Sequence, residues 1–61
     1  MIELIGRIVE VGTGETTYSG KLIEVNEDEV YLESDMAGWI VVPTDKVAYI
    51  REVAPKEDGN M

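Results

Sequence analysis

The chain has 61 residues, with thirteen acidic side chains against five basic ones and a net charge of −8 at neutral pH. A chain of this length forms one domain with a marginal core, and with neither Cys nor His it has no disulfide, thiolate–metal site or histidine-based catalytic centre. The negative charge disfavours binding to phosphate backbones, and no apolar run approaches the roughly 20 residues that a membrane-spanning helix needs. We therefore expect a cytoplasmic protein that is not an enzyme and has no cofactor, metal, membrane contact or DNA partner.

The first predicted element is a strand over Ile2–Val11, in which the apolar positions change parity near Gly6. Such a change of parity indicates a bulge or a bend in the strand. The triplet Gly12-Thr13-Gly14 predicts the turn that follows. It has neither the helix nor the Lys that accompany glycine triplets in phosphate-binding loops, so a hairpin turn is favoured.

A second, long strand is predicted over Glu15–Val25, with Gly20 in its interior. Glycine weakens a strand unless the backbone must bend there, and a small barrel needs such a bend. The polar turn that follows, Asn26–Glu29, contains the acidic run Glu27-Asp28-Glu29. This run is either a solvated turn or a divalent-cation site, and the turn is favoured because the spacing of a helix–loop–helix calcium loop is absent.

Three further strands complete the predicted domain: Val30–Glu33, Trp39–Val42 and Val47–Val53. Pro43 ends the fourth strand because proline cannot donate to a ladder, and Thr44-Asp45-Lys46 forms a tight connection to the fifth. Residues 1–53 are thus expected to form one all-β domain, followed by a flexible acidic tail over 54–61. The expected core consists of Leu4, Ile8, Val11, Leu22, Val25, Val30, Leu32, Val41, Val47 and Tyr49.

From Ile8 to Val53, the order of these signals resembles that of the Sm-like (Sm/Lsm) family, which includes the bacterial RNA-chaperone branch. The resemblance rests on the glycine-containing strand Tyr18–Asn26, the short strand Val30–Glu33, the strand Trp39–Val42, the connection Pro43–Asp45 and the final strand Val47–Ile50. It implies a five-stranded, strongly bent antiparallel SH3-like barrel with Sm-like strand order. The chain departs from the family in two respects: the short helix that usually precedes the first strand is missing, and the RNA-contact residues are poorly kept.

Family members assemble into rings in which strand four of one subunit pairs with strand five of the next. For this chain, the resemblance implies a homo-oligomeric ring of five to eight subunits, which would cover both exposed sheet edges. The implied interface residues lie on strands four and five: Trp39, Ile40, Val42, Ala48, Ile50 and Arg51.

The family also binds single-stranded RNA, and the candidate ligand- or RNA-binding residues here are Tyr18, Asn26, Trp39, Thr44 and Lys46. Tyr18 flanks the bent-strand glycine, and Trp39 is either a base-stacking platform or a partly buried interface residue. The cationic pair of the family's second contact loop is replaced by Pro43-Thr44, so Lys46 is the nearest cation. Lys21, Lys46 and Arg51 form either a small basic spot or ordinary solubilising charges.

These observations leave two functions open. A structural or protein-interaction scaffold is favoured by the acidic charge and the incomplete RNA contacts, and a ring that binds single-stranded RNA is the alternative. An enzyme is disfavoured because no Ser or Thr has a His partner, and a barrel this small has little room for a carboxylate pair across a cleft.

Overall fold

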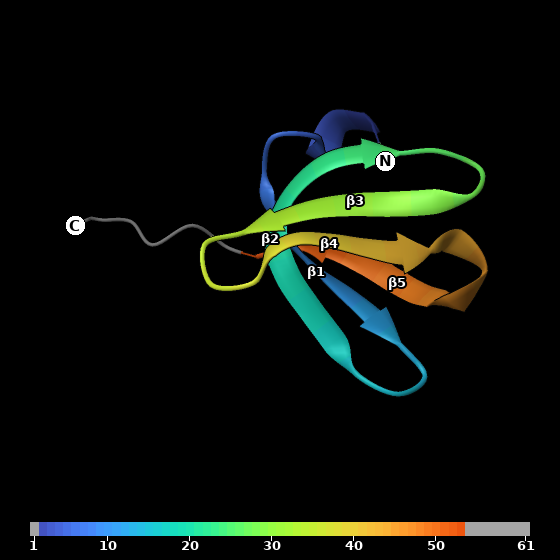
Figure 1. Cartoon of the computed structure of the whole chain (residues 1–61). Coiled ribbons are helices and arrows are strands. Elements are labelled where there is room, and N and C mark those ends of the chain that lie inside the picture. The colour runs from blue at the N-terminus through green and yellow to red at the C-terminus, as the bar shows by residue number, and fades with distance from the viewer. Residues whose placement is uncertain (1, 54–61) are drawn as a thin grey trace.

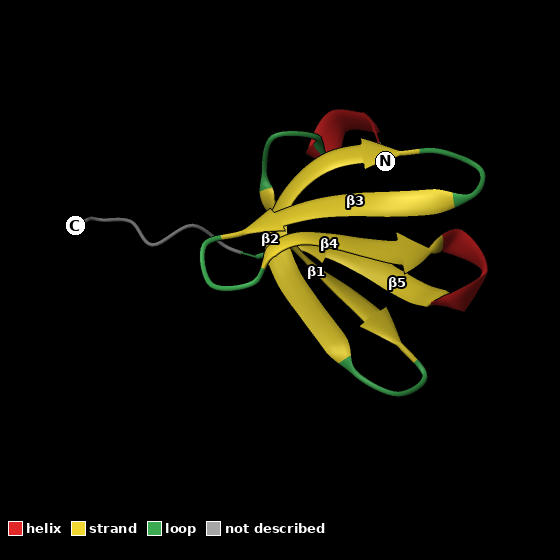
Figure 2. Cartoon of the chain, in the orientation of Figure 1, coloured by secondary structure: helices red, strands yellow, loops and turns green. Residues whose placement is uncertain are grey.

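The computed structural model describes residues 2–53, which form one antiparallel sheet of five strands (Figure 1). The strands are β1 (Ile8–Thr13), β2 (Thr17–Val25), β3 (Glu29–Ser34), β4 (Gly38–Pro43) and β5 (Val47–Glu52). Two single-turn 3-10 helices accompany them, η1 (Ile2–Leu4) and η2 (Thr44–Lys46), as Figure 2 shows. The predicted all-β class is therefore confirmed, whereas the predicted tail over 54–61 lies outside the described residues.

The strand order is β4-β3-β2-β1-β5, which leaves β4 and β5 at the two edges of the sheet. Each strand pairs with its neighbours in antiparallel register. Within residues 2–53 no ladder joins β4 to β5, so the sheet is strongly curved but not closed into a barrel. Both edge strands therefore have one side without a strand partner in the described chain.

The start of the chain differs from the predicted strand over Ile2–Val11. Residues 2–4 form η1, and Gly6 adopts a φ of 90°, a conformation that favours glycine. The segment then folds back on β2, because Gly6 N–H donates to the carbonyl of Leu22 (2.8 Å) and Leu22 N–H donates to the carbonyl of Arg7 (2.9 Å). The expected bend near Gly6 is confirmed, and the segment before the first strand contains only the single 3-10 turn of η1, with no α-helix in residues 2–53.

Strand β2 pairs with both β1 and β3, and it bends strongly along its length (Figure 1). Gly20 is buried where β2 passes close to β3, and a Cβ atom at this position would lie 2.8 Å from the carbonyl oxygen of Glu33. Real Cβ atoms essentially never come that close to another heavy atom, so only glycine allows this approach. A β-bulge between Leu22 and Glu24 adds to the curvature of the strand.

The core lies on one face of the curved sheet and consists of Val9, Val11, Leu22, Val30, Leu32 and Val42. Four of the ten expected core residues are in this set, and Leu4, Val25 and Val47 pack against it while partly buried. The burial of fully enclosed Val and Leu side chains stabilises the fold by about 1.5–3 kcal/mol each.

Three expected core residues are wrong: Ile8 (52% exposed), Val41 (50%) and Tyr49 (41%). Side chains alternate across a strand, so an error of one residue in parity transfers a side chain to the opposite face. Strand β1 begins only after the turn at Gly6, and this start places Val9 rather than Ile8 in the core. On β4 the same one-residue error in parity applies: Val41 was the predicted core residue, and Val42 is the buried one.

Candidate functional site: the edge strands and an adjoining groove

Strand β4 is an edge strand without a charged residue, Gly38-Trp39-Ile40-Val41-Val42-Pro43. Ile40 and Val42 point toward the core, so Trp39 (63% exposed) and Val41 lie on the outer face, the side of the sheet opposite the core. Natural edge strands usually carry charges, bulges or proline that prevent pairing with another chain, and β4 has only the proline at its end. This strand is therefore an exposed apolar edge.

The second edge strand, β5, carries an ordered polar cluster on the outer face. The Tyr49 hydroxyl donates to Glu10 Oε2 (2.6 Å), and the Arg51 guanidinium donates to Glu10 Oε1 (2.9 Å). The hydrogen bond from Tyr49, and the charge of Arg51 beside it, lower the pKa of Glu10, and the same hydrogen bond raises the pKa of Tyr49. The Tyr49 ring lies over Gly12, where a Cβ atom would overlap it.

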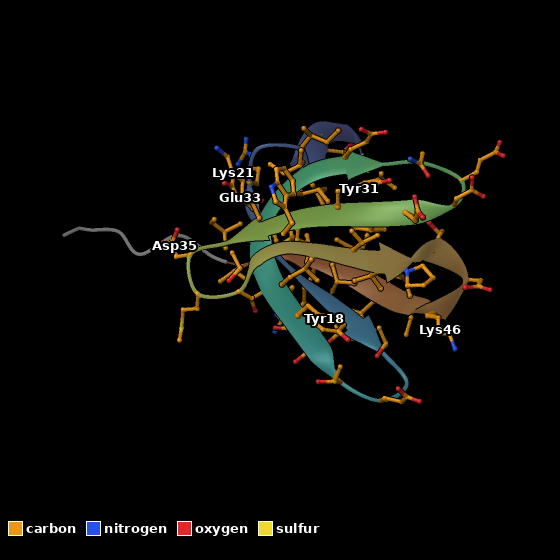
Figure 3. The ribbon with its side chains drawn as sticks, viewed as in Figure 1. Tyr18, Lys21, Tyr31, Glu33, Asp35 and Lys46 are labelled. Carbon is orange, nitrogen blue, oxygen red and sulfur yellow. The ribbon has the colours of Figure 1, made fainter. Side chains whose placement is uncertain are left out.

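A groove with a cavity of about 340 Å³ lies beside β4 and contains two of the candidate ligand residues, Tyr18 and Lys46. Its walls are the β1–β2 turn (Thr13, Gly14 and Glu15) and the end of β4 with η2 (Val42, Pro43 and Lys46). Figure 3 shows Tyr18 on β2 and Lys46 at the end of η2. The structure thus brings an aromatic ring and one cation to the same groove.

Asn26 and Thr44 are also brought together, but their side chains are used in the turn. Asn26 Oδ1 accepts hydrogen bonds from the backbone N–H groups of Asp28 and Glu29 (2.8 Å each), and its amide donates to Glu24 Oε2 (3.2 Å). The Thr44 hydroxyl donates to the carbonyl of Asn26 (3.1 Å). These side chains therefore join the β2–β3 turn to η2 instead of facing a ligand.

The remaining site predictions occupy the two edges. Trp39 does not line the groove and instead lies opposite Glu33 on the neighbouring strand. The six implied interface residues differ in exposure: Trp39, Ala48 and Arg51 are exposed, Ile40 and Ile50 are half-buried against the core, and Val42 is buried within it. The side chain of Val42 consequently has no surface to offer a partner.

Two surface features were not predicted from the sequence. One is the exposure of Val41 beside Trp39, which the consecutive apolar residues of β4 do not indicate. The other is a cavity of about 410 Å³ on the outer side, where Lys21, Glu33 and Asp35 lie close together in Figure 3. Its lining combines residues of β1, β2, β3 and the β3–β4 loop: Ile8, Ser19, Gly20, Lys21, Glu33, Ser34, Asp35 and Met36.

The turns around the groove carry a strong negative charge. Hydrogen bonds join η2 to the β2–β3 turn, and η2 and the β1–β2 turn line the same groove. The three turns therefore lie at one end of the molecule (Figure 1). Among the described residues, this end has Lys46 as its cation against the acidic residues Glu15, Glu24, Glu27, Asp28, Glu29 and Asp45. Glu29 accepts a hydrogen bond from the Tyr31 hydroxyl (2.6 Å), which raises the pKa of Tyr31.

In the part of the chain that the structure describes, no three His, Cys, Asp or Glu side chains converge in an arrangement able to hold a metal ion. The acidic run Glu27-Asp28-Glu29 lies in an exposed turn whose geometry Asn26 fixes. Over residues 2–53 the structure also contains no helix with the length and apolarity needed to cross a membrane. Comparisons with protein-family models, curated proteins and solved structures find no match to this chain.

Proposed function

We propose that this chain is a non-enzymatic Sm-like module whose copies join edge to edge into a ring of five to eight subunits. In this proposal the ring acts as a structural or protein-interaction scaffold in the cytoplasm. The observation that carries the proposal is the exposed, uncharged edge of β4 with Trp39 and Val41 on its outer face. An edge of this kind pairs readily with another strand, and a small domain gains stability when its edges are covered.

The position of the second edge explains why the proposed assembly is a ring. Each copy offers one β4 edge and one β5 edge, and these two surfaces are different. A contact between two different surfaces repeats from copy to copy, and it closes into a ring when the rotation between neighbours divides a full turn. The pairing of β4 with β5 of the next copy satisfies both edges of every subunit.

Charge and hydrogen bonding favour the scaffold over RNA binding. The turn end around the groove is acidic, and an RNA backbone would be repelled from it. The side chains of Asn26 and Thr44 already have partners within the chain. The alternative is an oligomeric ring that binds single-stranded RNA. It is supported by the presence of Tyr18 and Lys46 in one groove, because a base stacks on an aromatic side chain and a phosphate pairs with a cation.

The assembly is tested by light scattering and native mass measurement on the parent chain and on two matched variants. Val41→Lys places a charge on the β4 edge, and Ile8→Lys places the same charge at an equally exposed position on the interior strand β1. We expect the parent and Ile8→Lys to form the same discrete assembly and Val41→Lys to be a folded monomer. A parent chain that stays monomeric at all concentrations would overturn the proposal.

The RNA alternative is tested by titrating the parent chain with short uridine-rich and adenine-rich RNA at low salt. The scaffold proposal predicts no binding. Binding that weakens as salt is added, and that Tyr18→Ala and Lys46→Ala each reduce, would establish the alternative in its place.

A further inference from the structure

We infer that Arg51 of one copy stacks on Trp39 of the next and that this contact selects β5 as the strand that covers the β4 edge. The inference rests on the proposed edge-to-edge assembly and names the pair of side chains that specifies it. The observations behind it are the faces of the two edge strands, the hydrogen bond that holds Arg51 and the exposure of Trp39.

The faces of the edge strands determine which side chains become neighbours. Toward the core, β4 presents Ile40 and Val42, and β5 presents Val47 and Ile50. When the two edges pair, the core face of one copy can lie beside the core face of the next, or beside its outer face. Only the first arrangement continues the apolar layer from copy to copy, because the second places Arg51 on the side of Ile40 and Val42.

With like faces side by side, the outer-face residues of β4 lie beside those of β5. Trp39 and Val41 then meet Tyr49 and Arg51 of the neighbouring copy. Arg51 is the only charged residue on the outer face of either edge strand in the described chain, since β4 has none and Glu52 lies opposite the buried Val9, on the core side. It is therefore the cation of the neighbouring copy's edge strand that this arrangement places near the indole ring of Trp39.

Arg51 is already ordered for such a contact. Glu10 accepts hydrogen bonds from both Arg51 and Tyr49, so one carboxylate fixes two side chains on the same face. The Arg51 side chain remains 66% exposed, and its guanidinium plane is free to stack although one edge is hydrogen-bonded. A guanidinium held in this way loses little conformational freedom when it packs on an aromatic ring.

The receiving side of the contact is an exposed aromatic ring. Trp39 is 63% exposed, and its cross-strand neighbour on β3 is Glu33, which in turn lies opposite Lys21 on β2. Tryptophan is the aromatic side chain that attracts a cation most strongly. The uncharged β4 strand thus supplies an exposed aromatic surface, and β5 supplies a hydrogen-bonded cation.

The experiment compares Arg51→Ala with Arg7→Ala in the full chain. Arg7 is a matched control, because its side chain is 59% exposed and forms a single ion pair, with Glu52 at 3.0 Å. Trp39 is the sole tryptophan, so its fluorescence on dilution reports this contact directly while light scattering reports assembly. We expect Arg51→Ala to raise the concentration for half-assembly about tenfold and Arg7→Ala to change it by less than about threefold.

A double-mutant cycle with Trp39→Leu completes the test. Each single variant should weaken assembly, and the double variant should be no weaker than the worse of the two, because the lost contact is shared. Should Arg51→Ala fail to fold, Arg51→Gln replaces it in the cycle, because this side chain stays long and polar but carries no charge.

The outcomes separate the inference from the proposed function. Assembly of Arg51→Ala at the same concentration as Arg7→Ala, or additive effects in the cycle, would overturn the Arg51–Trp39 contact and leave edge pairing in place. A parent chain that never assembles would overturn both.

Discussion

At the scale of single residues, the most constrained surface group is the carboxylate of Glu10. It accepts one hydrogen bond from Tyr49 and one from Arg51, and it thereby links β1 to the outer face of the edge strand β5. The bond from Tyr49 and the charge of Arg51 lower the pKa of Glu10, and the bond to Glu10 raises the pKa of Tyr49, so both groups are held in the ionisation states they have at neutral pH.

This pair predicts a pH dependence of stability that has a definite sign. The folded state lowers the pKa of Glu10, so its contribution is present above the ordinary glutamate pKa of about 4.3 and is lost as pH falls through the lower folded value. The folded state raises the pKa of Tyr49, so its contribution is present below the ordinary pKa of about 10 and is lost as pH rises through the higher value.

Urea unfolding of the parent chain and of Glu10→Gln at a series of pH values measures the acid limb. We expect the difference in unfolding free energy to be constant from about pH 6 to pH 8 and to shrink below about pH 4. A difference that grows on acidification would show that the hydrogen bonds to Glu10 do not stabilise the fold.

The high-pH side is checked by spectrophotometric titration of the parent chain and of Tyr49→Phe. The variant should lack one of the high-pH tyrosine transitions of the parent chain.

At the scale of elements, the sequence was sufficient to predict four of the five strands to within about two residues. Those strands are alternating or continuous apolar runs rich in β-branched and aromatic residues, and turn residues such as Asn26 and Pro43 separate them. The sequence also marked Gly20 as a special position and predicted a bend there, whereas the close approach of the Glu33 carbonyl became evident only in the structure. The predicted start of the first strand was wrong, since η1 and the positive φ of Gly6 depend on contacts with β2.

The wrong core residues show why strand parity is harder to predict than strand position. Apolar residues occur consecutively on β4, so alternation gives no preference between Val41 and Val42. The groove could not be predicted for a different reason, because its residues come from separate segments that only the folded sheet brings together. Tyr18 and Lys46 were identified singly, but nothing in their spacing indicated that they share a cavity.

The assignment of faces on β4 is tested by two identical substitutions at adjacent positions. We expect Val42→Ala to lower the unfolding free energy by roughly 1–3 kcal/mol, because the buried methyl groups leave a cavity beside Leu32 and Val30. Val41→Ala removes the same atoms from an exposed position, and at a concentration where the chain is monomeric it should change stability by less than about 0.5 kcal/mol. Equal effects of the two substitutions in urea unfolding would contradict the assignment.

At the scale of the whole molecule, two opposing forces act on the proposed ring. The uncharged β4 edge and the small core favour association, whereas every copy carries a net charge of −8 and repels its neighbours. The acidic turns lie together at one end of each subunit, so a ring places many like charges close to one another. The edge contacts themselves involve few charges, and salt should therefore screen the repulsion more than it weakens the attraction.

Assembly is accordingly expected to strengthen as salt is added. The screening length falls from about 20–30 Å near 0.01–0.02 M salt to about 3–5 Å near 0.5–1 M. Dilution series followed by Trp39 fluorescence and light scattering should give a lower half-assembly concentration at the higher salt. Sodium chloride and potassium chloride at equal ionic strength should act alike, since screening does not depend on the identity of the cation. Assembly that weakens with salt would mean that ion pairs, and not the apolar β4 edge, hold the subunits together.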